Sequence, residues 1–173
     1  LNIEINFTRI NFVDEILQNQ LINIIFVTFC LMVLMNGSNF IDGINCNNVT
    51  YFLIVLSIIF FNFNNFELNN EILINLSIIL LTIVLLNSFG IIYLGDSGSY
   101  TLSIFFGVFL INFSLINSSI SPYFIIVLLW YPCFELLFSM IRRFSIKNKT
   151  YEPDTDHLHH LIYKKFKINT KFK

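Results

Sequence analysis

Two short stretches of the chain combine an aspartate with glycines, in a sequence that holds only eleven acidic residues. The first runs from Asn36 to Asn45 and contains Asp42, and the second runs from Tyr93 to Ser99 and contains Asp96. Carboxylates are the hard oxygen ligands that Mg²⁺ prefers, and the neighbouring glycines let a ligand approach the backbone closely. Ser97 and nearby backbone N–H groups could hold a phosphate at a helix start. Either stretch alone could be an ordinary turn or cap; together they indicate a site for phosphate and a divalent cation.

A second group of candidate ligands lies near the C-terminal end. His157, His159 and His160 fall close together there, and with neighbouring lysines they could donate hydrogen bonds to a phosphate. Zinc fits less well, because no cysteine lies near them and their spacing is not HExxH. A solvated helix start is the plain structural alternative. Arg142 and Arg143 precede this group and could serve both as an interfacial anchor and as phosphate ligands.

The composition is that of a membrane protein. Hydrophobic residues make up 55% of the 173 residues and charged residues only 12%, against about 25% charged residues in a typical soluble domain. This excludes an ordinary soluble globule, a disordered chain and a nucleic-acid-binding protein. Nine of the ten Lys and Arg residues lie between Arg142 and Lys173, and the tenth is Arg9. The C-terminal end of the chain is therefore expected to be cationic and exposed to water.

Apolar segments predict an all-α fold, a polytopic transmembrane helical bundle with about five spanning helices. Their apolar positions are not confined to one stripe, which favours burial among lipid and neighbouring helices. Pro132 is expected to kink or interrupt the last segment. Glu135, inside that same segment, is a candidate functional carboxylate or the structural partner of a neighbouring helix. The predicted segments are residues 21–35, 49–61, 72–86, 100–116 and 123–141.

The distribution of basic residues predicts the topology. Five spans alternate the loops between two sides, and the side with nine basic residues faces the cytoplasm by the positive-inside rule. Residues 1–20 then form an extracytoplasmic segment, residues 21–141 form the bundle with cytoplasmic loops 36–48 and 87–99, and residues 142–173 form a basic cytoplasmic tail. The two Asp/Gly stretches and the histidines are thereby predicted to share one face.

The ordered set of motifs resembles a known family. Asn-Phe-Ile-Asp-Gly-Ile-Asn, Leu-Gly-Asp-Ser-Gly-Ser, Pro-x-Phe-Glu with Arg-Arg, and Asp-x-x-His-Leu-His-His-Leu follow one another over about residues 36–162. Together they are similar to the polyprenyl-phosphate N-acetylhexosamine-1-phosphate transferases, the WecA/MraY family. The His-Leu-His-His form looks more like the WecA branch.

The resemblance implies a reaction, a metal and a location. The phosphate of a membrane-embedded polyprenyl phosphate attacks a UDP-N-acetylhexosamine, and UMP leaves. Mg²⁺ is the implied cofactor, with Mn²⁺ as an alternative. The resemblance is also compatible with a homodimer. The bacterial cytoplasmic membrane is the implied location, with the site on the cytoplasmic face. By this resemblance Asp96 is the catalytic metal ligand and Asp42 the second, and the substrate-binding residues are Asn39, Asp42, Gly43, Asn45, Ser97, Arg142, Arg143, His157, His159 and His160.

The chain also departs from the family pattern. Members often carry Asp-Gly where this sequence has Asn45 and Cys46, and the family's adjacent Asp-Asp pair is absent. We therefore expect the sequence to be the central part of a longer enzyme, inactive by itself. A polytopic transporter or a catalytically inactive homologue remains as an alternative.

Overall fold

The computed structural model describes residues 3–5, 7–43, 46–63, 70–117 and 120–145. Every regular element in these ranges is an α-helix, which confirms the all-α prediction. His157, His159, His160 and Asn45 lie outside the described residues. The helices are α1 (Asn11–Leu17), α2 (Gln20–Ile41), α3 (Asn47–Asn62), α4 (Asn70–Ser88), α5 (Gly95–Ile116), α6 (Pro122–Leu128) and α7 (Trp130–Ser145).

Three of these helices are long and apolar enough to cross a membrane: α2, α4 from Glu71 to Ser88, and α5. At 22 residues each, α2 and α5 reach about 33 Å, enough for a hydrocarbon core of about 30 Å. With 16 residues, α3 reaches only about 24 Å. Counting α6 and α7 as one bent span gives up to four spans. The described helices thus provide fewer full spans than the five predicted, because the second apolar segment is short and the fifth is broken.

The fifth predicted segment is two helices, with a bend of 64° between α6 and α7. Pro132 has no N–H to donate to the carbonyl of Leu128, four residues earlier, so a continuous helix would leave that carbonyl unpaired. The chain instead ends α6 at Leu128, and the hydroxyl of Tyr51 in α3 donates a hydrogen bond to the Leu128 carbonyl. The predicted interruption is therefore present, and it lies just before the first turn of α7, where proline is tolerated.

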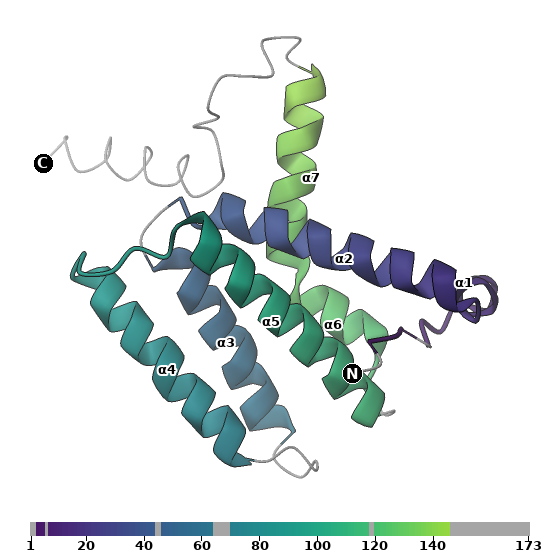
Figure 1. Cartoon of the computed structure of the whole chain (residues 1–173), viewed down its shortest axis with the longest axis horizontal. Coiled ribbons are helices and arrows are strands. Elements are labelled where there is room, and N and C mark those ends of the chain that lie inside the picture. Colours follow the sequence, from purple (N-terminus) through teal and green to yellow (C-terminus); the bar gives the residue numbers. More distant parts are fainter. Residues whose placement is uncertain (1–2, 6, 44–45, 64–69, 118–119, 146–173) are drawn as a thin grey trace, which may run out of the picture.

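The central helix is α2, which packs against both α5 and α7, and Figure 1 shows it crossing between them. Its Gly37 lies so close to α7 that a Cβ there would overlap the backbone carbonyl of Pro132. On the other side, a Cβ on Gly107 of α5 would meet the flexible ends of Leu31 and Leu34. Small residues thus let helices approach closely, as is common in membrane bundles.

Aromatic side chains fill the centre of the bundle between α3 and α5. The rings of Phe52 and Phe106 stack with their centroids 4.6 Å apart, and both side chains are fully buried. At the far end, the ring of Phe63 meets the edges of Phe113 and Phe124. Many apolar side chains of the three long helices are exposed instead, and only 17–33% of each spanning window is buried. Such a surface fits contact with lipid.

Replacing the Tyr51 donor tests the account of the broken helix. Tyr51→Phe should destabilise the bundle by about 1–3 kcal/mol, because it leaves the buried Leu128 carbonyl without its donor. Equilibrium unfolding in detergent, followed by helical circular dichroism, measures the change. Tyr123→Phe, at an exposed tyrosine of α6, is the matched control and should be near neutral. An equal effect of both substitutions would contradict this role for Tyr51.

Candidate functional site

Four helix ends gather at one end of the bundle. They are the last turn of α2, the first turn of α3, the last turn of α4 and the first turn of α5 (Figure 1). In the structure α2 continues to Ile41 and α5 begins at Gly95. Asn39 is therefore helical, Asp42 directly follows α2, and Asp96 and Ser97 lie in the first turn of α5. The two motif stretches are thus mostly helix termini, joined by short connections.

Asp42 and Asp96, 54 residues apart in the sequence, come close together at this end. Burial and, as the smaller cause, the nearby negative charge of Asp96 together raise the pKa of Asp42 to about 6. Asp42 is half-buried and Asp96 is exposed, and two neighbouring carboxylates repel each other unless a cation lies between them. Mg²⁺ usually binds one or two protein carboxylates and takes its other ligands from water and substrate phosphates. This donor pair therefore fits the metal that the motifs imply.

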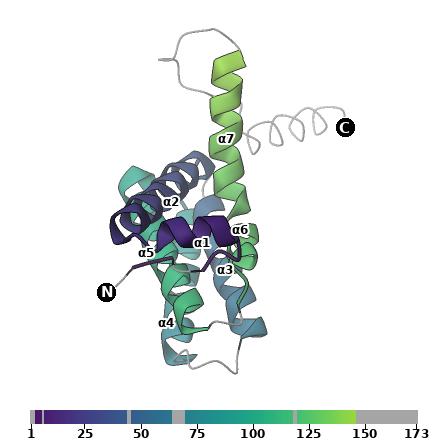
Figure 2. The same cartoon turned by 90° about the vertical axis from the view of Figure 1, so that its right-hand side faces the viewer.

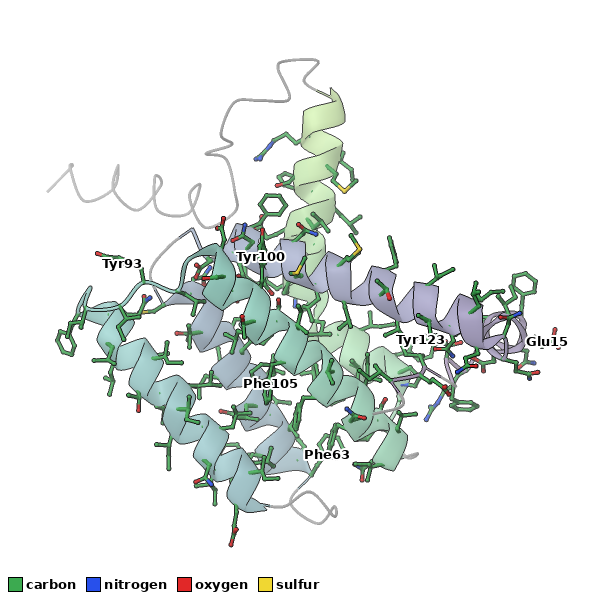
Figure 3. The ribbon with its side chains drawn as sticks, viewed as in Figure 1. Glu15, Phe63, Tyr93, Tyr100, Phe105 and Tyr123 are labelled. Atoms are coloured by element: carbon green, nitrogen blue, oxygen red, sulfur yellow. The ribbon has the colours of Figure 1, made fainter. Side chains whose placement is uncertain are left out.

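A pocket opens beside Asp42. Its volume is about 190 Å³, and it is lined by Asp42, Asn87, Tyr93, Leu94 and Gly95. Figure 3 shows Tyr93 on the connection before α5, extending away from the helices, and Tyr100 on the first turns of α5. The lining comes from the end of α2, the end of α4 and the start of α5, so the pocket exists only when these three ends are held together.

A buried hydrogen bond joins α3 to α5 next to the two carboxylates. The side-chain amide of Asn48 donates to Oγ of Ser99 at 2.8 Å, and both side chains are fully buried. Ser99 lies three residues after Asp96, on the next turn of α5. A hydrogen bond in this water-poor place costs more to break than one on the surface. It therefore fixes the start of α5 relative to the start of α3.

A second contact joins the start of α3 to the end of α4. The backbone N–H of Cys46 donates to Oδ1 of Asn87 at 2.7 Å, and the Cys46 thiol donates to the Val84 carbonyl at 3.4 Å. Cys46 has a φ of +69°, in the left-handed region that favours glycine. The family pattern often has glycine there. This chain has a side chain in that conformation and uses the thiol to bind α4.

Two further contacts complete the arrangement. The side-chain amide of Asn39 donates to the Tyr100 hydroxyl at 3.3 Å, which joins the last turns of α2 to the first turns of α5. The amide of Asn47 donates to the Ile41 carbonyl at 2.8 Å and so satisfies a carbonyl at the end of α2. Asn39, Asp42, Asp96 and Ser97 therefore lie on connected helix ends, as a shared site requires.

Other predicted residues are less closely placed. Gly43 is exposed just after Asp42. The guanidinium of Arg142 lies 5.7 Å from the centre of the Phe138 ring, one turn earlier in α7. Figures 1 and 2 both show the C-terminal half of α7, which carries Arg142, extending away from the other helices. Arg143 belongs to α7, and its side chain is not among those described. Glu135 is fully buried, so it faces protein rather than lipid.

Asn48, Asn87 and Tyr100 were not predicted as site residues, although each makes a contact that holds the site together. The sequence feature that could have identified them is a polar side chain at the end of an apolar segment. Asparagine is so frequent in this sequence, for example at positions 62, 64 and 65, that its position alone could not mark these residues. Only the pairing of their side chains across helices separates them from the other asparagines.

Comparison with known proteins finds a partial match. The chain is 31% identical over 74 residues to the undecaprenyl-phosphate alpha-N-acetylglucosaminyl 1-phosphate transferase of Thermotoga maritima. The match covers 43% of this chain and 24% of that relative, so the chain spans about a quarter of the relative's length. No family model and no solved structure matches the chain. The match confirms the resemblance to this transferase family that the motifs indicate.

A double-mutant cycle tests the contact between Asn48 and Ser99. Asn48→Ala and Ser99→Ala should each destabilise the chain by about 1–3 kcal/mol, because each leaves a buried polar group without its partner. The pair should show a coupling energy of about 1 kcal/mol in equilibrium unfolding in detergent.

Ser77, whose hydroxyl binds the Ile74 carbonyl within α4, provides the control. The cycle of Asn48→Ala with Ser77→Ala should be additive within about 0.5 kcal/mol. Additivity of the Asn48 and Ser99 substitutions would show that their hydrogen bond does not stabilise the site.

Proposed function

We propose that this chain is part of an integral membrane transferase of the WecA type. The enzyme moves an N-acetylhexosamine 1-phosphate, in the first instance N-acetylglucosamine 1-phosphate, from a UDP-sugar to a polyprenyl phosphate and releases UMP. The product would serve the synthesis of a cell-envelope polysaccharide. One observation carries the proposal: Asp42 and Asp96, from separate motifs, come together at the end of a membrane bundle.

The location of the carboxylates suits the two substrates. A polyprenyl phosphate keeps its chain in the bilayer and its phosphate at the surface, and a UDP-sugar arrives from water. A site at helix ends meets both, whereas a site in the middle of the bundle would have to desolvate the nucleotide. The basic residues from Arg142 onward support a cytoplasmic location for this end, where nucleotide sugars are made.

The reaction needs positioning and charge neutralisation more than covalent chemistry by the protein. An oxygen of the polyprenyl phosphate attacks the β-phosphorus of the UDP-sugar, a new P–O–P linkage forms, and the bond to the UMP oxygen breaks. Asp42 and Asp96 would hold Mg²⁺, which when bound neutralises charge on the diphosphate. Ser97 and the first N–H groups of α5 lie at the positive end of a 22-residue helix dipole and support phosphate binding.

The remaining predicted ligands would act on the other phosphates. Asn39 is held by Tyr100 beside Asp42 and could donate to the nucleotide. Arg142, Arg143, His157, His159 and His160 supply cations or hydrogen-bond donors of the kind that recognise phosphate. Their approach to the carboxylate pair is part of the proposal.

Removing the Asp96 carboxylate tests the assignment. Membranes that contain the full-length parent protein are given UDP-N-acetylglucosamine labelled in the sugar, undecaprenyl phosphate and Mg²⁺, and butanol-extractable label is counted. Asp96→Asn should reduce the rate by roughly 100-fold or more, because metal binding supplies several kcal/mol of charge stabilisation. EDTA should abolish the label in the unaltered protein.

Glu71→Gln is the matched control, since Glu71 is an exposed acid in the first turn of α4, at the opposite end of that helix from Asn87. It should leave the rate unchanged. Normal turnover by Asp96→Asn would refute its role. Absence of label with every UDP-N-acetylhexosamine tried would favour a transporter or an inactive homologue.

The histidine motif is tested separately. His159→Ala with His160→Ala should lower the rate roughly 10- to 100-fold, the loss expected when hydrogen bonds to a charged phosphate are removed. Lys171→Ala with Lys173→Ala, also in the basic tail, is the control for loss of charge. If the two double variants have the same rate as the unaltered protein, the histidines have no part in the transfer.

A further inference from the structure

The short helix α1 and the segment before it are fixed to the start of the spanning helix α2. The side chain of Asn23 in α2 is almost fully buried. Its amide donates to the Ile5 carbonyl at 2.9 Å and to the Leu17 carbonyl at 3.0 Å, and its Oδ1 accepts from the Ile5 N–H at 3.0 Å. One residue thus holds both the segment before α1 and the last residue of α1, so α1 has a defined orientation on α2.

The residues of α1 divide into a polar and an apolar face. At about 100° per residue, Asn11, Asp14 and Glu15 share one side, and Phe12, Val13, Ile16 and Leu17 share the other. Leu17 is 4% exposed and packs inward, whereas Phe12 is 71% exposed and Ile16 is 39% exposed. Within the described residues, half of the apolar face of α1 is therefore left uncovered.

On the polar face, the carboxylate of Asp14 accepts two hydrogen bonds from Thr8. The backbone N–H of Thr8 donates to Asp14 at 2.6 Å, and the Thr8 hydroxyl donates to the same oxygen. These hydrogen bonds keep the pKa of Asp14 below its usual value. Figure 3 shows Glu15 beyond the N-terminal end of α2, directed away from the bundle. The carboxylates of this face are stable only where water can solvate them.

The uncovered apolar side chains of α1 continue the outward surface of α2. Leu21 and Ile25, in the first turns of α2, are 67% and 60% exposed, and in a helix that spans a membrane such residues face lipid. Figure 2 shows α1 lying across the end of α2 rather than extending it. Only Gln18 and Asn19 separate the two helices, so α1 lies where the span leaves the hydrocarbon.

We propose that α1 lies in the membrane–water interface, with Phe12 and Ile16 inserted among the lipids and Glu15 in water. The ligand is a lipid surface, and the contact anchors the spanning helix α2 at the end opposite the carboxylate pair. A charged face opposite an apolar face that includes an aromatic ring is the pattern of a helix that lies in the interface. This inference does not depend on the transferase activity.

Fluorescence in lipid vesicles tests the proposal. Trp130 is the one tryptophan of the sequence, so Trp130→Phe removes its fluorescence from the background. Phe12→Trp then reports on the apolar face of α1, and Glu15→Trp, on the polar side of the same helix, is the matched control. The full chain is reconstituted into phosphatidylcholine vesicles, whose zero net charge avoids repulsion of Asp14 and Glu15. Separate samples carry bromine near the headgroups or deep in the acyl chains. Circular dichroism confirms that each variant keeps its helices, and Ile16→Trp serves as the reporter if Phe12→Trp does not fold.

The expected result is a blue-shifted emission for Phe12→Trp that the shallow bromines quench more than the deep ones, with unshifted and weakly quenched emission for Glu15→Trp. Three outcomes would overturn the proposal. Unshifted emission from both positions would place α1 in water. A blue shift without quenching at position 12 would mean that protein, such as a second copy, covers this face. Stronger quenching by deep bromines at both positions would place α1 inside the hydrocarbon.

Discussion

Asn48 donates a hydrogen bond to Ser99 in a part of the bundle from which water is excluded, and the relative positions of the starts of α3 and α5 depend on it. In such a place a polar side chain without a partner is costly, so the start of α3 and the start of α5 have few alternative arrangements. Asp96 lies three residues before Ser99, and α3 follows the connection that begins with Asp42. The bond therefore holds the two carboxylates close together.

The contacts around Cys46 have the same effect on the other side of the site. Its left-handed backbone strains any residue except glycine, and this strain persists only if other contacts outweigh it. The bonds from its N–H and thiol to α4 supply those contacts. Cys46 is thus bound to Asn87, and Asn48 in the first turn of α3 is bound to Ser99, so the start of α3 contacts both ends of the stretch from Asn87 to Ser99. Cys46 thus adopts the left-handed backbone conformation that glycine usually provides.

The rest of the bundle positions this end of the molecule. The break before Pro132 turns α7 away from α6, and Tyr51 replaces the donor that the proline lacks. Gly37 allows α2 to pack directly on the Pro132 backbone. At the opposite end, Asn23 fixes α1 on α2. The hydrogen bonds of Tyr51 and Asn23 satisfy backbone groups that lipid could not satisfy, and the close approach at Gly37 fixes α2 against α7.

The sequence alone determined the membrane class and the all-α fold, and it marked Asp42 and Asp96 as candidate ligands. Composition, hydropathy and Asp/Gly motifs are local properties, so they can be read without the structure. It also predicted an interruption at Pro132, since the missing N–H is a property of that residue. It did not determine that Asp42 and Asp96 are neighbours, that Asn48 and Asn87 hold them, or that α1 lies across α2. Those facts depend on contacts between residues far apart in the chain, and only the packing of the helices decides which of many asparagines find partners.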